Sequence, residues 1–171
     1  MKEKPVRKPL RLGGYDYSQA GCYFITICTY NREHLLGRIV GADDSVRPSM
    51  IIEESEIGRI ARVCWSKMDD IYETIRAGKF CIMPNHIHGI IFIEQGGHDG
   101  GTGGQSRPPL HKVLQEYKSV TTRMCFQMGC QKIWQRSYHD HIIRNEAEYQ
   151  HIWRYIDENP ARWEEDVYFK K

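Results

Sequence analysis

Short runs of β-branched and aromatic residues recur along this chain, and each run predicts a strand. The runs cover residues 22–29, 79–83, 86–93 and, around Trp134, 132–137. Pro84-Asn85 separates the second run from the third, which predicts a turn or a bulge at that point. Residues 35–40 are expected to pair back on the first run as a short hairpin strand, and 43–48 to form a loop.

Three longer segments carry apolar residues three or four positions apart, which predicts amphipathic helices. These segments are residues 53–68, 110–128 and 145–159. The last one begins with Asn145 and has Glu148 three residues later, a pattern that resembles a capping box, and Pro160 ends it.

The order of these elements favours an α+β fold. Strand, helix, two strands, helix, strand and helix follow one another, which is typical of helices packed on one antiparallel sheet. We expect a ferredoxin-like sheet with helices on one face and a further helix at the C-terminus. The 171 residues suit one domain, over 21–171, after a basic N-terminal arm of residues 1–20. Residues 95–109 contain six glycines and two prolines and are predicted to form a flexible surface loop.

Composition excludes some classes of function. No apolar run approaches the roughly 20 residues that span a bilayer, so we expect no membrane partner. The six cysteines form no C-x-x-C pair, and several lie in apolar runs. This usage is typical of reduced thiols in a cytoplasmic protein.

Positive charge is unevenly distributed, although the formal net charge is only +2. Basic residues crowd the first dozen positions and recur through the middle of the chain with few acids among them. Those in the middle are Lys112, Lys118, Arg123, Lys132, Arg136 and Arg144. A basic arm and stripe suit a partner with a phosphate backbone, but ordinary surface charge would give the same pattern.

Two histidines, His86 and His88, stand at the start of an apolar run. Alternate residues of a strand share a face, so both imidazoles are expected to point the same way and supply half of a metal site. His139 and His141 form a second His-x-His with Asp140 between them. A metal site is less favoured there, because no apolar strand follows and Asp140 can simply orient a histidine by hydrogen bonding.

On the last predicted helix, Tyr155 lies at the flank of the apolar stripe, and Asn159 follows one turn later on the same flank. This flank therefore presents a phenol and an amide oxygen together. An aromatic at the rim of the core and a helix-ending asparagine before Pro160 would give the same pattern. Tyr117 and Tyr149 fall on apolar stripes, so packing is expected for them.

Four segments of the chain together resemble the single-tyrosine HUH transposases. They are GYDYSQAGCYFITICTYNREHLLGRI, MPNHIHGIIF, WQRSYHDHIIRN and YQHIWRYIDENP. The pattern is most similar to the branch of REP-associated tyrosine transposases, and the resemblance extends from Arg11 to Pro160.

The resemblance implies a metal-dependent single-stranded DNA endonuclease and strand transferase. His86 and His88 match the pair that binds a divalent cation, Mg²⁺ or Mn²⁺, and Asn159 matches the third ligand. Tyr155 matches the nucleophile, so the C-terminal helix would carry the nucleophile and form a 5′-phosphotyrosine intermediate. Candidates for contacts to the DNA phosphates are Lys118, Arg123, Arg136 and Arg144.

The expected partner is single-stranded DNA with hairpin structure, such as a REP-like sequence, bound by a monomer or a homodimer. The expected location is the cytoplasm, in association with the nucleoid through DNA. Other functions stay open on the sequence alone. A ferredoxin-like module or a domesticated transposase can bind nucleic acid without cleaving it, and Tyr155 would then be dispensable. A hydrolase of the histidine-triad type would need a third alternating histidine, where this chain has Ile90.

Overall fold

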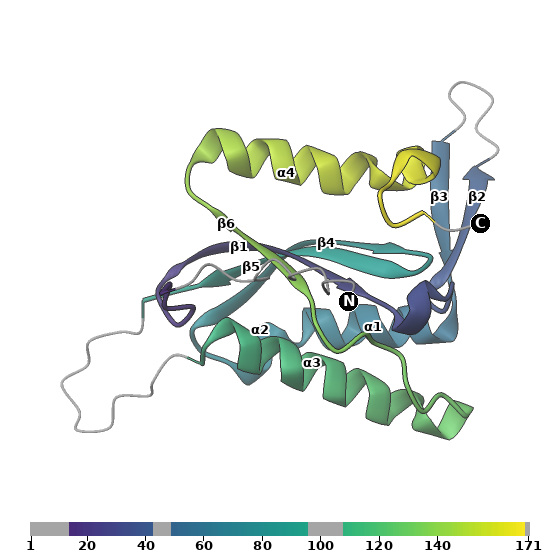
Figure 1. Cartoon of the computed structure of the whole chain (residues 1–171), viewed down its shortest axis with the longest axis horizontal. Coiled ribbons are helices and arrows are strands. Elements are labelled where there is room, and N and C mark those ends of the chain that lie inside the picture. The colour runs from purple at the N-terminus through teal and green to yellow at the C-terminus, as the bar shows by residue number, and fades with distance from the viewer. Residues whose placement is uncertain (1–13, 43–48, 96–107, 170–171) are drawn as a thin grey trace, which may run out of the picture.

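A four-stranded antiparallel sheet forms the centre of the fold (Figure 1). The computed structural model describes residues 14–42, 49–95 and 108–169, and its central strands lie in the order β4-β5-β1-β6. They are β1 (Gly21–Cys28), β4 (Ile75–Met83), β5 (His86–Ile93) and β6 (His139–Ile143). This order and pairing are ferredoxin-like, so the predicted α+β fold is confirmed.

Helices cover both faces of the sheet. One face carries α1 (Glu56–Ser66), α2 (Met68–Ile71) and α3 (Leu110–Cys125), and the other carries α4 (Glu146–Glu158) (Figure 1). A separate apolar cluster fills each interface. The expected arrangement, with helices on one face and the C-terminal helix apart from them, is therefore found.

Strand β5 assigns its side chains to these two layers by simple alternation. Ile87 and Ile91 belong to the cluster beneath α1 and α3, whereas Ile90 packs with α4. His86 and His88 share the side of Ile90, which places them on the α4 face. Gly89 points the other way, and a Cβ there would lie 2.3 Å from Trp65, so only glycine allows this helix to approach so closely.

Local contacts fix the position of α4. The Asn145 side chain accepts a hydrogen bond from the Glu148 N–H at 2.9 Å, which confirms the predicted N-cap. At the other end of the helix, Lys79 on β4 pairs with Asp157 and lies 3.8 Å above the ring of Trp153. These contacts hold α4 against the sheet face that carries the two histidines.

A separate hairpin corrects one prediction. β2 (Gly37–Ala42) pairs with β3 (Ser49–Glu54) and does not pair back on β1, so the expected partner of residues 35–40 was wrong. The predicted helix over 53–68 also starts later, because the Ser55 hydroxyl accepts from the Gly58 N–H and caps α1. The predicted loop at 43–48 lies outside the described residues.

The fourth strand corrects another prediction. Trp134 forms only an isolated bridge with Thr29, and the strand expected over 132–137 is instead β6. β6 lies at the sheet edge and exposes His139 and His141, so it lacks the apolar run by which a buried strand is identified.

Three further expectations concern the chain as a whole. All six cysteines are free thiols, and four of them are buried. Among the described residues, no helix combines the length and apolar character that a membrane span needs. Residues 1–13 of the predicted arm and 96–107 of the predicted loop lie outside the described residues.

Candidate functional site

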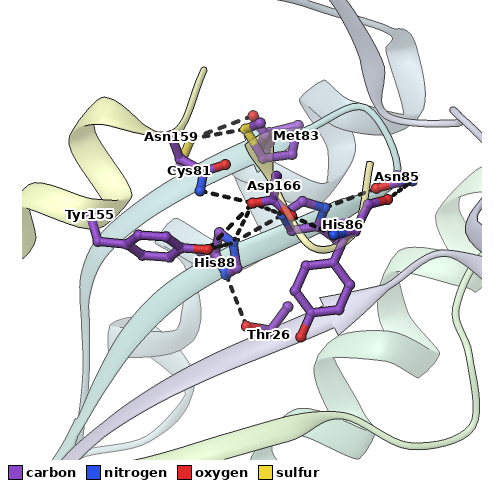
Figure 2. A network of polar contacts seen from close by, with 11 residues as sticks. Thr26, Cys81, Met83, Asn85, His86, His88, Tyr155, Asn159 and Asp166 are labelled. Carbon is purple, nitrogen blue, oxygen red and sulfur yellow. Dashed lines mark hydrogen bonds and ion pairs between the residues drawn. The ribbon is translucent and has the colours of Figure 1, made fainter. Parts of the chain in front are cut away.

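Two buried imidazoles lie side by side on the α4 face of β5 (Figure 2). His86 and His88 are 0% and 1% exposed, and their Nε2 atoms are 3.0 Å apart. Burial of an imidazole is costly unless its nitrogens have partners, so the neighbouring polar groups decide what this pair can do.

Two polar side chains hold the far nitrogens of the pair. Asn85 Oδ1 lies 2.9 Å from His86 Nδ1, and an amide oxygen only accepts, so this nitrogen carries the proton. Thr26 and His88 lie opposite each other in the β1–β5 ladder, and Thr26 Oγ1 is 2.9 Å from His88 Nδ1. When Thr26 accepts, both Nε2 lone pairs face the same gap, an arrangement that a cation stabilises.

A carboxylate that the sequence analysis missed completes this cluster. The 3₁₀ segment η3 (Asn159–Glu165) turns the chain back after α4 and brings Asp166 to the histidines. Asp166 Oδ2 lies 3.9 Å from each Nε2 atom, and its side chain is 1% exposed. One ligand atom from each of the three residues lies within 4.8 Å of the others, so His86, His88 and Asp166 can hold a metal ion.

The charges of the cluster suit a cation. Burial lowers the pKa of both imidazoles, and for His86 the neighbouring His88 lowers it further. Burial alone would raise the pKa of Asp166, but the nearby histidines and the Tyr168 N–H, 2.6 Å from Oδ1, hold it below its ordinary value. At neutral pH the cluster therefore presents two neutral imidazoles and one carboxylate, the protonation states that metal ligands need.

Tyr155 projects from α4 onto this cluster (Figure 2). Its hydroxyl lies 3.3 Å from His88 Nε2 and 3.3 Å from Asp166 Oδ2, while the residue remains 38% exposed. Burial and the negative charge of Asp166 raise the pKa of this phenol, so its proton needs an acceptor before the oxygen can attack. The structure thus unites Tyr155 of α4 with the histidine pair on the sheet face that α4 covers.

Asn159, the predicted third metal ligand, lies beside Asp166 at the cluster. It is 3% exposed, and its Nδ2 donates to Asp166 Oδ2 at 3.0 Å. Its Oδ1 is buried and has no hydrogen-bond partner among the described residues. Asn159 therefore orients the Asp166 carboxylate and keeps one buried acceptor for a ligand.

Three other tyrosines differ in their distance from the cluster: Tyr117 and Tyr149 are in packing contacts, and Tyr168 lies against the histidines. Tyr117 donates to the Ala61 carbonyl in the core at 3.1 Å, and Tyr149 packs against Phe92, so both have the packing roles expected of them. Tyr168, which the sequence analysis did not single out, lies with its ring centroid 4.8 Å from that of His86. The cluster is therefore flanked by two phenols, of which Tyr155 has its oxygen against the ligand atoms.

The second His-x-His is not a metal cluster in the described part of the chain. His141 Nε2 lies 2.6 Å from Glu148 Oε1. Glu148 is also the residue whose N–H donates to the capping side chain of Asn145. The only group of three possible ligands found among the described residues is that of His86, His88 and Asp166.

The four predicted DNA contacts fall into two places. Lys118, Arg123 and Arg136 line one groove between α3 and residues 131–138, whereas Arg144 follows β6 on the way to α4. The Lys118 ammonium donates to the carbonyls of Gln135, Arg136 and Ser137, so it holds the loop that forms one wall. Arg123 and Arg136 are exposed.

Comparison with known proteins finds similar proteins, although no family model matches the chain. An uncharacterized protein of Haemophilus influenzae is 34% identical over 178 residues, which cover 94% of this chain and 91% of that protein. Among solved structures, a REP-associated tyrosine transposase bound to a REP hairpin superposes with a TM-score of 0.59 at 21% identity. The superposition covers 95% of this chain and 74% of the transposase, so the two share a fold.

Proposed function

We propose that this chain, which belongs to the same family as the Haemophilus influenzae protein and has a tyrosine transposase fold, is a metal-dependent single-stranded DNA endonuclease and strand transferase. The observation that carries the proposal is the position of the Tyr155 hydroxyl. It lies 3.3 Å from His88 Nε2, beside three buried groups that can hold a metal ion.

The residues present fit a divalent cation. His86, His88 and Asp166 offer two neutral nitrogens and one charged oxygen, and Asn159 Oδ1 is a buried acceptor with no partner in the part of the chain that the structure describes. Such a mixed set, with room for further oxygen ligands, suits Mg²⁺ or Mn²⁺. When bound, the ion would polarise a non-bridging oxygen of the scissile phosphate.

The Tyr155 oxygen is the proposed nucleophile. It forms a bond to phosphorus while the bond from phosphorus to the 3′ oxygen breaks, which leaves a 5′-phosphotyrosine and a free 3′-OH. The phenol hydroxyl lies 3.3 Å from Asp166 Oδ2, a contact that orients it towards the cluster, and in the net reaction its proton passes to the departing 3′ oxygen. The phosphodiester is exchanged and not hydrolysed, so a 3′-OH can reverse the step and join a different strand.

The proposed substrate is hairpin-forming single-stranded DNA. The similar transposase is bound to a REP hairpin, and this chain has a basic groove as well as Arg144 beside the sheet edge. We assign phosphate contacts to Arg123, Arg136 and Arg144, and to Lys118 the support of the groove wall. The protein would act as a monomer or a homodimer, in the cytoplasm and associated with the nucleoid.

The test is incubation of the purified protein with labelled hairpin DNA and Mn²⁺, followed by denaturing electrophoresis. A covalent protein–DNA adduct should form, and Tyr155→Phe should abolish it, because no other group would supply the attacking oxygen. Binding of DNA without any adduct in the wild-type protein would instead favour the non-catalytic module.

Tyr168→Phe is the matched control, because Tyr168 is the other phenol against the histidines. This variant should still form the adduct. An adduct that is lost in Tyr168→Phe and retained in Tyr155→Phe would show that the nucleophile has been assigned to the wrong ring.

A further inference from the structure

The groove that carries Arg123 and Arg136, two of the phosphate contacts proposed above, lies on the side of the sheet away from α4. It has a volume of about 950 Å³ and lies between α3 and residues 131–138. Because α3 covers the sheet face opposite α4, the groove and Tyr155 belong to different layers (Figure 1). We propose, on the basis of the DNA-binding function proposed above, that this groove holds an unpaired stretch of that DNA, and that it does so whether or not the DNA is cleaved.

The charge of the groove favours an anion. Among the described residues no aspartate or glutamate lines it, whereas Arg123, Lys132 and Arg136 do. None of these three cations forms an ion pair within the part of the chain that the structure describes, and all three are exposed. Lys132 lies 3.8 Å over the ring of Tyr30, which fixes its position without neutralising it. Unneutralised cations along a groove attract a phosphate backbone.

The remaining lining suits bases that are not stacked on one another. Phe126 is 64% exposed at the end of α3, where its ring is a platform for a base. Four glutamines share the groove: Gln115, Gln127, Gln131 and Gln135. Each amide offers a donor and an acceptor, the pattern that base edges present. The bases of a duplex are stacked on one another, and an acidic peptide has no bases. An unpaired strand is therefore the ligand that can contact the phenyl ring, the amides and the cations at the same time.

The route between the two layers passes the edge of the sheet. β6 is the outermost strand, exposes His139 and His141, and ends next to the exposed Arg144. A strand held in the groove can therefore continue around this edge towards Tyr155. Binding in the groove would nevertheless persist in a protein that does not cleave DNA.

Fluorescence anisotropy of a labelled single-stranded oligonucleotide without hairpin potential, measured in EDTA with the full chain, tests the groove. Phe126→Ala should weaken binding about 5- to 150-fold, the range expected for the loss of one stacked base. Arg136→Gln should weaken binding and lower the dependence of log K on log salt by about 0.7, as expected for one phosphate of a single strand. Because EDTA withholds the metal, this binding is measured separately from the adduct experiment, whatever the outcome of that experiment.

Matched controls lie outside the groove. Ile71→Ala removes an apolar side chain that is 54% exposed on α2, and Arg59→Gln removes a cation that pairs with Glu56 on α1. Both should bind single-stranded DNA normally. Wild-type affinity in Phe126→Ala and Arg136→Gln would overturn the proposal, as would equal affinity for a duplex of the same length. Displacement of the DNA by polyglutamate at equal charge concentration would show that the groove is an unspecific anion site.

Discussion

The two faces of the sheet carry polar residues that differ in burial and in how closely they are grouped. On the α4 face, His86, His88 and Asp166 are buried and bonded to neighbours that fix their orientation. On the α3 face, Arg123 and Arg136 are exposed at the rim of a groove. The first arrangement concentrates a few groups on one point, and the second spreads charge over a surface.

This difference follows from what each task demands. Groups that hold a cation and activate a phosphate need fixed geometry and a low local dielectric, which burial provides. Cations that attract a flexible polyanion act over the Debye length and need contact with solvent until the ligand arrives. One sheet can serve both tasks because alternate residues of its strands belong to different layers.

The largest effect is expected from the loss of a metal ligand, which should change the chemistry of the α4 face and leave the groove on the α3 face unaffected. His88→Ala should abolish adduct formation and lower Mn²⁺ affinity at least about 100-fold, because it removes a metal ligand and the partner of Tyr155. It should leave binding of single-stranded DNA to the groove unchanged. Calorimetry with Mn²⁺ and anisotropy with DNA measure the two effects separately.

His141→Ala is the control, since it removes an exposed histidine of the second His-x-His that pairs with Glu148. Its Mn²⁺ affinity should equal that of the wild type. A loss of Mn²⁺ binding in His141→Ala, with retention in His88→Ala, would place the metal centre on β6 and contradict our assignment.

A smaller effect is expected from the residue that orients His88. Thr26→Val keeps the shape of the side chain but removes the hydroxyl 2.9 Å from His88 Nδ1. Loss of such a neighbour to a metal ligand typically costs 10- to 100-fold in metal affinity, and we expect a loss of about this size. Calorimetric titration with Mn²⁺ measures it.

Thr121→Val is a matched change in the other layer. Thr121 is likewise buried, and its hydroxyl donates to the Tyr117 carbonyl within α3. Its substitution should leave Mn²⁺ affinity unchanged. If both variants lost the same affinity, the effect would come from the stability of the fold and not from the orientation of His88.

The smallest effect concerns pH and stability without metal. The pKa values of His86 and His88 are lowered in the folded state, so below about pH 6.5 the unfolded chain binds more protons than the folded one. The free energy of unfolding should therefore fall as pH decreases from 7 to 5, by at most about 1.4 kcal/mol per pH unit for each histidine. Asp166 has a lowered pKa, so its own stabilising contribution is lost only at still lower pH.

Urea denaturation in EDTA at several pH values measures this slope. The double variant His86→Ala, His88→Ala should show a flatter dependence, whereas Arg136→Gln in the groove should keep the slope of the wild type. An unchanged slope in the double variant would show that the pair does not control acid stability.

Several features of the fold could be predicted because they depend on neighbours in sequence. The order of the sheet strands and of the helices that cover them, the N-cap at Asn145 and the shared face of His86 and His88 are found, whereas β3 was not predicted. The strand predicted around Trp134 was wrong, because the fourth strand of the sheet is β6. This edge strand has exposed histidines at alternate positions and therefore lacks the apolar pattern by which strands are predicted. The pairing of residues 35–40 was wrong because β3, which begins at Ser49, is closer in sequence to β2 and pairs with it in place of β1.

The sequence by itself determined the imidazole pair, the phenol on the last helix and the uneven spread of positive charge, since periodicity and composition are local properties. Only the tertiary structure decided that Asp166 joins the pair, that Asn159 turns its nitrogen to that carboxylate, and that the basic groove lies on the other layer. These relations depend on how η3 folds back and on which face each helix packs. Contacts between residues distant in sequence arise from the burial of apolar surface on both sides of the sheet, and no spacing along the chain encodes them.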